Sequence, residues 1–117
     1  MIALFLLLQI APVRTYWPVT ITKLWSGTNL RTHVALTGVV AYTRLEADSD
    51  FHIRLVVDTA ALHDTAAAFV IVEMIPAIPL PHPKVRSRIT VYGIYRRDPE
   101  HRNWPEVHPC ERWEVAP

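Results

Sequence analysis

Hydrophobic and polar residues alternate along five segments of the chain, and this period of two residues is typical of β-strands that bury one face. Each segment is rich in Val, Ile, Thr and aromatic residues and is bounded by Pro, Asp or Asn. The predicted strands cover residues 33–45, 50–58, 68–75, 87–97 and 104–115. Helical periodicity is weak throughout, so the pattern predicts an all-β fold.

Two glycines interrupt long predicted strands. Gly38 lies inside 33–45 and Gly93 inside 87–97, where a glycine weakens the strand unless a bulge or a sharp bend requires it. Long strands bent at glycines are what a small closed barrel needs, because five strands must coil strongly to close. We therefore predict a five-stranded Greek-key barrel of the OB type, with an open all-β sandwich as the alternative.

The segments outside the five predicted strands have sequences that predict different local structures. Four prolines within "IPAIPLPHP" (75–83) exclude a helix, because each proline removes a backbone donor and clashes with the preceding turn. We predict a stiff, extended Pro-rich connector between strands three and four. Residues 59–68 form either one or two helical turns capped by Asp58 or a structured loop. Residues 18–27 form either an entering strand or a short helix ended by Gly27.

The first residues form an apolar segment of a different kind. Residues 2–10 are apolar apart from Gln9, which suits a signal-peptide core and is too short for a transmembrane span, although the usual preceding basic residue is missing. A signal peptide over residues 1–14 would make the protein secreted or periplasmic. Otherwise the protein is cytoplasmic, and the segment is a first strand or a docked terminus. The predicted organisation is a lead-in over 1–30 and a barrel domain over 31–117.

Composition narrows the range of partners. With 117 residues, half of them hydrophobic, the chain matches a single folded domain. Its formal net charge of +1 weakens the case for nucleic-acid binding, because phosphate contacts usually need a surplus of Lys and Arg. Cys110 is the single cysteine, so an internal disulfide is excluded. A lone cysteine of this kind is more typical of a small buried hydrophobe than of a nucleophile.

Several short motifs resemble a family of small bacterial OB-fold domains that have no assigned biochemical role. The matching pieces are "TGVV" (37–40), "DSDFHIRL" (48–55), "VEMIP" (72–76), "ITVYGIYRRDPEH" (89–101) and "WPEVHP" (104–109). The family pattern has an Asp-Gly-Asp turn before an aromatic residue and His-Ile, and a later Trp-x-Glu-x-His-Pro strand. Ser49 departs from it, since the family often has glycine there. The resemblance covers about two thirds of the chain and implies an OB barrel that binds a ligand.

Alternation along the strands also groups the polar residues that could carry chemistry. His52 and Arg54 share one face of the second strand, and Glu106 and His108 share one face of the fifth. Glu73 interrupts an apolar strand, and a buried carboxylate needs a partner. We therefore expect four side chains on one barrel face, with Asp48 and Asp50 at its rim: His52, Glu73, Glu106 and His108.

Three interpretations of this cluster stay open. It is a structural network that holds strands in register, a divalent metal site formed by the four side chains, or a site of general acid–base chemistry through Glu73 or Glu106. No HxH or HExxH spacing supports a metal site and no nucleophile motif supports catalysis. Without bound metal, no cofactor is expected.

The leading functional hypothesis is a non-enzymatic OB-type binding module for an oligonucleotide, an oligosaccharide or a protein. The residues predicted to contact its ligand are His52, Arg54, Tyr92, Tyr95, Trp104, Glu106 and His108. One alternative is a metal-dependent hydrolase that uses the His/Glu cluster. Another is a protein that self-assembles into homo-oligomers through its apolar N-terminal segment.

Overall fold

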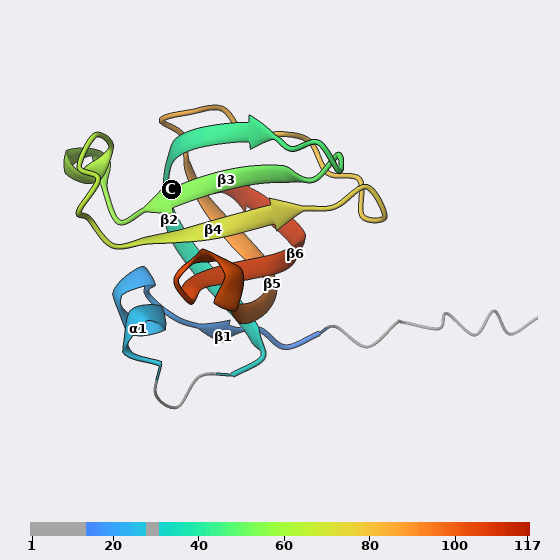
Figure 1. Ribbon diagram of the computed structural model, residues 1–117, viewed down its shortest axis with the longest axis horizontal. Coiled ribbons are helices and arrows are strands. Elements are labelled where there is room, and N and C mark those ends of the chain that lie inside the picture. The colour runs from blue at the N-terminus through green and yellow to red at the C-terminus, as the bar shows by residue number, and fades with distance from the viewer. Residues whose placement is uncertain (1–13, 28–30) are drawn as a thin grey trace, which may run out of the picture.

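A computed structural model describes residues 14–27 and 31–117 of the protein (Figure 1). Its main strands are β2 (His33–Leu45), β3 (Phe51–Val56), β4 (Phe69–Met74), β5 (Arg88–Asp98) and β6 (Trp104–Val115). Each predicted strand is present, with its ends moved by at most two residues. The all-β prediction is confirmed.

The five strands close into a barrel because β2 pairs with a different strand along each half of its length. Its first half is antiparallel to β5 and its second half is antiparallel to β3. The next pairings are β3 with β4, β4 with β6 in parallel, and β6 with β5. The resulting order β2-β3-β4-β6-β5, closed by β2–β5, is a Greek-key order and confirms the predicted OB-type barrel. The open sandwich is wrong, because this closure leaves none of the five strands at a free edge.

Gly38 and Gly93 lie where the barrel wall bends. Gly38 marks the point at which β2 changes partner from β5 to β3, and a Cβ there would overlap the backbone oxygen of Val56. At Gly93 the register between β5 and β6 shifts, and a Cβ would overlap the backbone oxygen of Pro109. Any larger residue would push these strands apart, so glycine is required at both bends.

Part of the predicted lead-in is built into the barrel. The short strand β1 (Trp17–Pro18) pairs in parallel with β2, and helix α1 (Ile21–Ser26) follows it at the same end of the barrel (Figure 1). The hydroxyl of Thr20 caps α1 by accepting a hydrogen bond from the Lys23 N–H at 3.0 Å. The sequence left a strand and a short helix open for residues 18–27, and both are present, because Pro18 ends β1 and α1 follows.

Two observations bear on the remaining N-terminal predictions. The signal peptide predicted over residues 1–14 and the predicted self-assembly segment fall, except for Arg14, on residues 1–13, which lie outside the described part of the chain. Within the described part, the structure contains no helix whose length and apolar character would let it cross a membrane.

The conformations of the segments between the strands follow from the residues that they contain. The Pro-rich connector contains no helix or strand, and it is anchored where the Trp113 indole N–H donates to the Pro81 carbonyl oxygen at 2.7 Å. Between β3 and β4, a 3₁₀ turn (Thr59–Ala61) begins after Asp58, whose carboxylate accepts from the Ala61 N–H at 3.2 Å. A second 3₁₀ turn (Pro99–His101) joins β5 to β6.

Inward-facing side chains from all five barrel strands form one core with α1. Its buried members are Ile21, Leu24, Val34, Leu36, Val40, Ile53, Leu55, Val70, Val72, Met74, Ile89, Val91, Val107 and Cys110. Burial raises the pKa of the Cys110 thiol to about 11. The thiol is therefore uncharged at neutral pH and acts as a small apolar core group.

The turn from β2 to β3 holds a residue in a left-handed conformation. Ser49 has a φ of 72°, and its N–H donates to the Glu46 carbonyl oxygen at 3.0 Å. The Asp48 carboxylate accepts from the Asp50 N–H at 3.0 Å, which fixes the direction in which the chain enters β3. This position is the one at which the sequence departs from the glycine of the family pattern.

We expect Ser49→Gly to raise the free energy of unfolding by roughly 0.5–1 kcal/mol, because glycine adopts positive φ without steric cost. Ala47→Gly is the matched control in the same turn. Ala47 has no positive φ, so this change should lower the free energy of unfolding by a similar amount. Urea unfolding of both variants measures the effect, and equal destabilisation by the two glycines would contradict it.

Candidate functional site

The outer face of the barrel wall between β3 and β5 gathers the polar residues. Across this wall, His52 of β3 is opposite Glu73 of β4, and Ile71 of β4 is opposite Glu106 of β6. Glu106 is in turn opposite Arg96 of β5. Because side chains alternate between faces, these residues and His108 point away from the core. The structure thus brings His52, Glu73, Glu106 and His108 together.

Two histidines share the Glu73 carboxylate. His52 Nε2 lies 2.5 Å from Glu73 Oε1, and His108 Nε2 lies 3.6 Å from Glu73 Oε2. His52 Nδ1 also lies 3.4 Å from Glu46 Oε1, and His108 Nε2 lies 3.7 Å from Asp50 Oδ2. The side chains thus form one continuous chain from Glu46 to Asp50, and Asp50 takes a direct part in the cluster.

Glu106 is satisfied by a different pair of residues. Its side chain is 1% exposed, Arg96 Nε donates to its Oε1 at 2.9 Å, and Trp104 Nε1 donates to its Oε2 at 2.9 Å. Arg96 also places a terminal nitrogen 3.8 Å from Glu73 Oε2. Both oxygens of Glu106 therefore accept hydrogen bonds from Arg96 and Trp104, and this carboxylate fixes the positions of those two side chains.

The environment of Glu73 changes its acidity. Burial, followed by the nearby negative charge of Glu106, raises the pKa of the Glu73 carboxyl to about 7. His108 and Arg96 act in the opposite direction but do not cancel these effects. A carboxyl with such a pKa can either hold or release a proton near neutral pH, as a general acid or base does.

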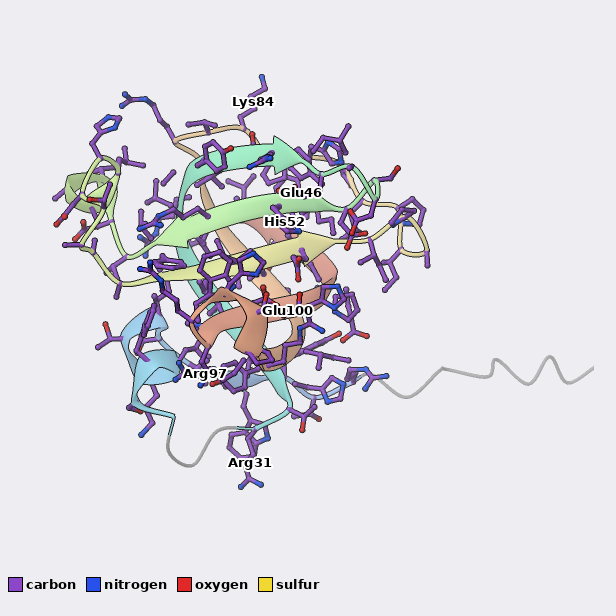
Figure 2. All side chains as sticks on the ribbon, viewed as in Figure 1. Arg31, Glu46, His52, Lys84, Arg97 and Glu100 are labelled. Carbon is purple, nitrogen blue, oxygen red and sulfur yellow. The ribbon has the colours of Figure 1, made fainter. Side chains whose placement is uncertain are left out.

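The cluster, apart from the buried Glu106, lines an open cleft of about 440 Å³. Six carboxylates, three histidines and one arginine line it, and they come from the turn before β3, from β3, β4 and β5, from the second 3₁₀ turn and from β6. Figure 2 labels Glu46, His52 and Glu100, which lie over this face. Carboxylates therefore outnumber basic side chains in this acidic cleft.

His101 joins the cleft to the β5–β6 connection. Its Nδ1 lies 2.7 Å from Asp98 Oδ2, and this hydrogen bond raises the pKa of the His101 imidazole. Burial acts to raise the pKa of Asp98, but the hydrogen bonds from His101 and from the Glu100 N–H outweigh it and the net pKa is lowered. The pair holds the imidazole at the edge of the cleft.

An aromatic cavity of about 490 Å³ adjoins the acidic cleft and shares Glu100 and His101 with it. His101 stacks on Trp104 with a 4.5 Å centroid separation, and Phe69 meets both Trp104 and Trp25 edge-on at 5.6 and 5.4 Å. Arg102 completes the lining. Helix α1 thus supplies Trp25 to a surface otherwise formed by β4, β6 and the turn before β6.

Besides Trp104, which lines the aromatic cavity, and the buried Glu106, three further predicted ligand contacts lie outside the lining of the acidic cleft. The Arg54 guanidinium covers the Phe69 ring at 4.0 Å on the same outer face, and burial lowers its pKa. Tyr92 packs on Tyr16 at 5.2 Å, away from the cluster. Tyr95 packs against the core, and its hydroxyl accepts a hydrogen bond from Arg97 at 2.7 Å. These three positions do not converge with His52 and His108.

Sequence reasoning missed several residues of this face. Trp25, Phe69 and His101 are not among the residues that the sequence predicts to bind a ligand. Their only sequence signal is aromatic or imidazole character near a strand end. Such residues meet only when α1 and the β5–β6 connection are packed on the barrel.

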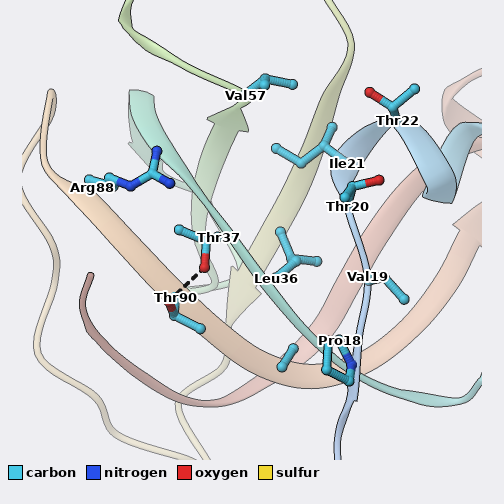
Figure 3. A pocket seen from close by; sticks show the side chains of 11 residues that line it. Pro18, Val19, Thr20, Ile21, Thr22, Leu36, Thr37, Val57, Arg88 and Thr90 are labelled. Atoms are coloured by element: carbon cyan, nitrogen blue, oxygen red, sulfur yellow. Dashed lines mark hydrogen bonds between the residues drawn. The ribbon is translucent and has the colours of Figure 1, made fainter. Parts of the chain in front are cut away.

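A further pocket of about 500 Å³ lies between β1, α1 and the start of β5 (Figure 3). Threonines, apolar residues and Arg88 line it, and two of these threonines, Thr37 and Thr90, share a 2.7 Å hydrogen bond (Figure 3). It brings together no carboxylate, imidazole or aromatic ring from the described residues. The acidic cleft and the aromatic cavity therefore form the candidate functional site.

Comparison with known proteins supports the fold. No family model and no curated protein sequence matches the chain. Among solved structures, it is similar to a protein described as a putative aspartyl-tRNA synthetase from Leishmania major Friedlin, with a TM-score of 0.57 and 10% sequence identity. The match covers 92% of this chain and 22% of the synthetase chain. At this identity the likeness shows a shared barrel fold.

The raised pKa of Glu73 predicts how stability depends on pH. Glu73 binds its proton more tightly in the folded chain, so its stabilising contribution is present below about pH 4.5 and is lost as the pH rises towards 7. Relative to Glu73→Gln, the protein should lose on the order of 2 kcal/mol of unfolding free energy between pH 5 and pH 8.

Urea unfolding at several pH values, in buffer with EDTA, measures this difference. Glu100→Gln is the control, because Glu100 is an exposed carboxylate of the same cleft. The unfolding free energy of this control should change with pH in the same way as that of the unmodified protein. If the unfolding free energy of Glu73→Gln also changed with pH in the same way as that of the unmodified protein, the prediction would be contradicted.

Proposed function

We propose that the protein is an OB-type binding module whose outer-face site binds an oligosaccharide. The observation that carries the proposal is the position of the site. In OB folds the face of the second and third strands, together with the first and fourth connecting loops, binds oligonucleotides and oligosaccharides. Here those parts are β3, β4, the turn 46–50 and the connection 99–103, and they line the cleft or the adjoining cavity.

The aromatic cavity suits a ring-shaped ligand. Trp104 and Phe69 are partly buried and held by their neighbours, and Trp25 is 39% exposed. Aromatic rings held in this way offer apolar surface at little entropic cost. A pyranose ring or a nucleobase could pack on them, so the neighbouring charges decide between the two ligands.

The charges favour a neutral, polyhydroxylated ligand. Six carboxylates face the cleft, its three histidines each contact a carboxylate, and its single arginine is committed to Glu106 and Glu73. A phosphodiester backbone that leaves the aromatic cavity along this cleft would meet like charge. Sugar hydroxyls, in contrast, donate hydrogen bonds to carboxylates, which only accept them. The acidic cleft is therefore matched to hydroxyl groups and poorly matched to phosphates.

The family resemblance agrees with this proposal. The turn before β3 and the Trp-x-Glu-x-His-Pro strand lie beside each other at the site, and Ser49 adopts the positive φ that suits the glycine of the family pattern. The synthetase whose barrel is similar acts, by its name, on a tRNA, but its 10% identity carries only the fold. The metal-dependent hydrolase and the self-assembling protein stay predictions, and the segment that would mediate assembly is not described.

The test is a binding titration with neutral hexasaccharides of β-1,4-linked glucose, α-1,4-linked glucose and β-1,4-linked N-acetylglucosamine, followed by tryptophan fluorescence and calorimetry. We expect one of them to bind, and Trp104→Ala to weaken that binding by about tenfold or more, the equivalent of roughly 1.4 kcal/mol. Trp17→Ala is the control, because Trp17 is exposed in β1 and lines neither cavity.

A single-stranded oligothymidylate at low salt forms the second arm of the titration. Binding of this oligonucleotide that depends on Trp104, with no response to any hexasaccharide, would replace the proposed ligand by a nucleic acid. Equal losses in the Trp104→Ala and Trp17→Ala variants would remove the aromatic cavity as the binding site. Thermal unfolding of both variants checks that each is folded.

A further inference from the structure

A buried carboxylate oxygen points at two other metal-ligand atoms at one end of the acidic cleft. Glu73 is 6% exposed, and among the described residues its buried Oε2 accepts no hydrogen bond. Burying a carboxylate oxygen without a partner is costly. His108 Nε2 at 3.6 Å and Arg96 at 3.8 Å lie too far from this oxygen for a good hydrogen bond. This oxygen is therefore available to a ligand.

The spacing of the three atoms fits a small cation. His108 Nε2 lies 3.6 Å from Glu73 Oε2 and 3.7 Å from Asp50 Oδ2, and all three ligand atoms lie within 4.8 Å of one another. Ligands of a tetrahedral ion at about 2.1 Å are separated by about 3.4 Å. Small side-chain adjustments would bring the three atoms to these distances.

We propose that Asp50, Glu73 and His108 bind a divalent transition-metal ion, for which Zn²⁺ and Mn²⁺ are the probes. One imidazole and two carboxylates form a donor set that suits such ions. This set differs from the one expected from sequence, because Glu106 uses both oxygens on Arg96 and Trp104. Asp50 takes the place that Glu106 was expected to fill.

His52 acts as a positioning residue in this site. It holds Glu73 Oε1 at 2.5 Å through Nε2, and its Nδ1 faces Glu46 Oε1 at 3.4 Å. This contact turns the other oxygen of Glu73 towards Asp50 and His108. Hydrogen bonds to the far side of a ligating carboxylate orient it and strengthen metal binding, so Glu46 and His52 support the site without touching the ion.

The charge balance around the site favours a cation even though Arg96 is near. Arg96 is about half exposed, and its short contact is with Glu106, so its terminal nitrogen can move away from Glu73 at little cost. The remaining charged groups of the cleft are dominated by carboxylates. The side chains of Asp50 and His108 are 17% and 26% exposed, which gives an ion a path from the solvent.

Three protein ligands leave at least one coordination position open towards the cleft, where a water or a ligand oxygen would bind. Metal binding does not depend on the aromatic cavity, because none of the three ligands lines it. The proposed metal site and the proposed oligosaccharide site can therefore fail separately. Trp104→Ala should lose oligosaccharide binding and keep metal binding.

Calorimetric titration of untagged, EDTA-treated and dialysed protein with ZnCl₂ and with MnCl₂ tests the site. We expect one equivalent of at least one of the two ions to bind and to raise the unfolding temperature. Asp50→Asn and His108→Gln each remove one ligand with little change of shape, and each should weaken binding at least tenfold. His52→Gln should weaken it by about 10–100-fold, the range seen for groups that support metal ligands.

Each ligand variant has a matched control from the same cleft. Glu100→Gln removes a carboxylate and His101→Gln removes an imidazole, and neither residue belongs to the proposed ligand set. Both controls should bind the ion within about threefold of the unmodified protein, since they alter only more distant charge. Failure of both ions to bind the unmodified protein, or equal losses in the controls and in the ligand variants, would overturn the proposal.

Discussion

The parallel pairing of β4 with β6 is the interaction on which both the barrel and its site depend. It joins the sheet β2-β3-β4 to the β5–β6 hairpin, and the β2–β5 pairing then closes the wall. The same register, Ile71 opposite Glu106, sets Glu73 beside His108 on the outer face. A shift by one residue would turn either Val72 or Val107 outwards and would break the core and the site together.

The outer face of the barrel carries charged side chains that are buried, whereas charged side chains on the outside of a barrel wall are usually exposed to solvent. Glu73 and Glu106 face away from the core but are almost fully buried, because long and aromatic side chains from neighbouring strands cover them. Charged groups in such a place must be paired or protonated. Glu106 is paired completely, whereas Glu73 has a raised pKa and one oxygen that accepts no hydrogen bond among the described residues. The chemistry of the site therefore centres on Glu73.

Local signals in the sequence determined most of the fold. Alternation placed the strands within two residues of their ends, and the glycines at 38 and 93 marked the bends because the packed wall leaves no room for a side chain there. The prolines of 75–83 excluded a helix. The short segment 18–27 could not be resolved, because its helix is stabilised by burying Ile21 and Leu24 in the barrel rather than by its own propensity.

The candidate site was determined by the sequence only in part. Alternation showed which residues of one strand share a face, so His52, Glu73, Glu106 and His108 could be grouped in advance. Distances across strands depend on register and closure, which no local pattern encodes. Tertiary structure alone therefore decided that Glu106 pairs with Arg96 and Trp104, that Asp50 reaches His108, and that Trp25 and His101 complete an aromatic cavity. It also separated Tyr92 and Tyr95 from the site, because Tyr95 packs against the core and Tyr92 packs on Tyr16.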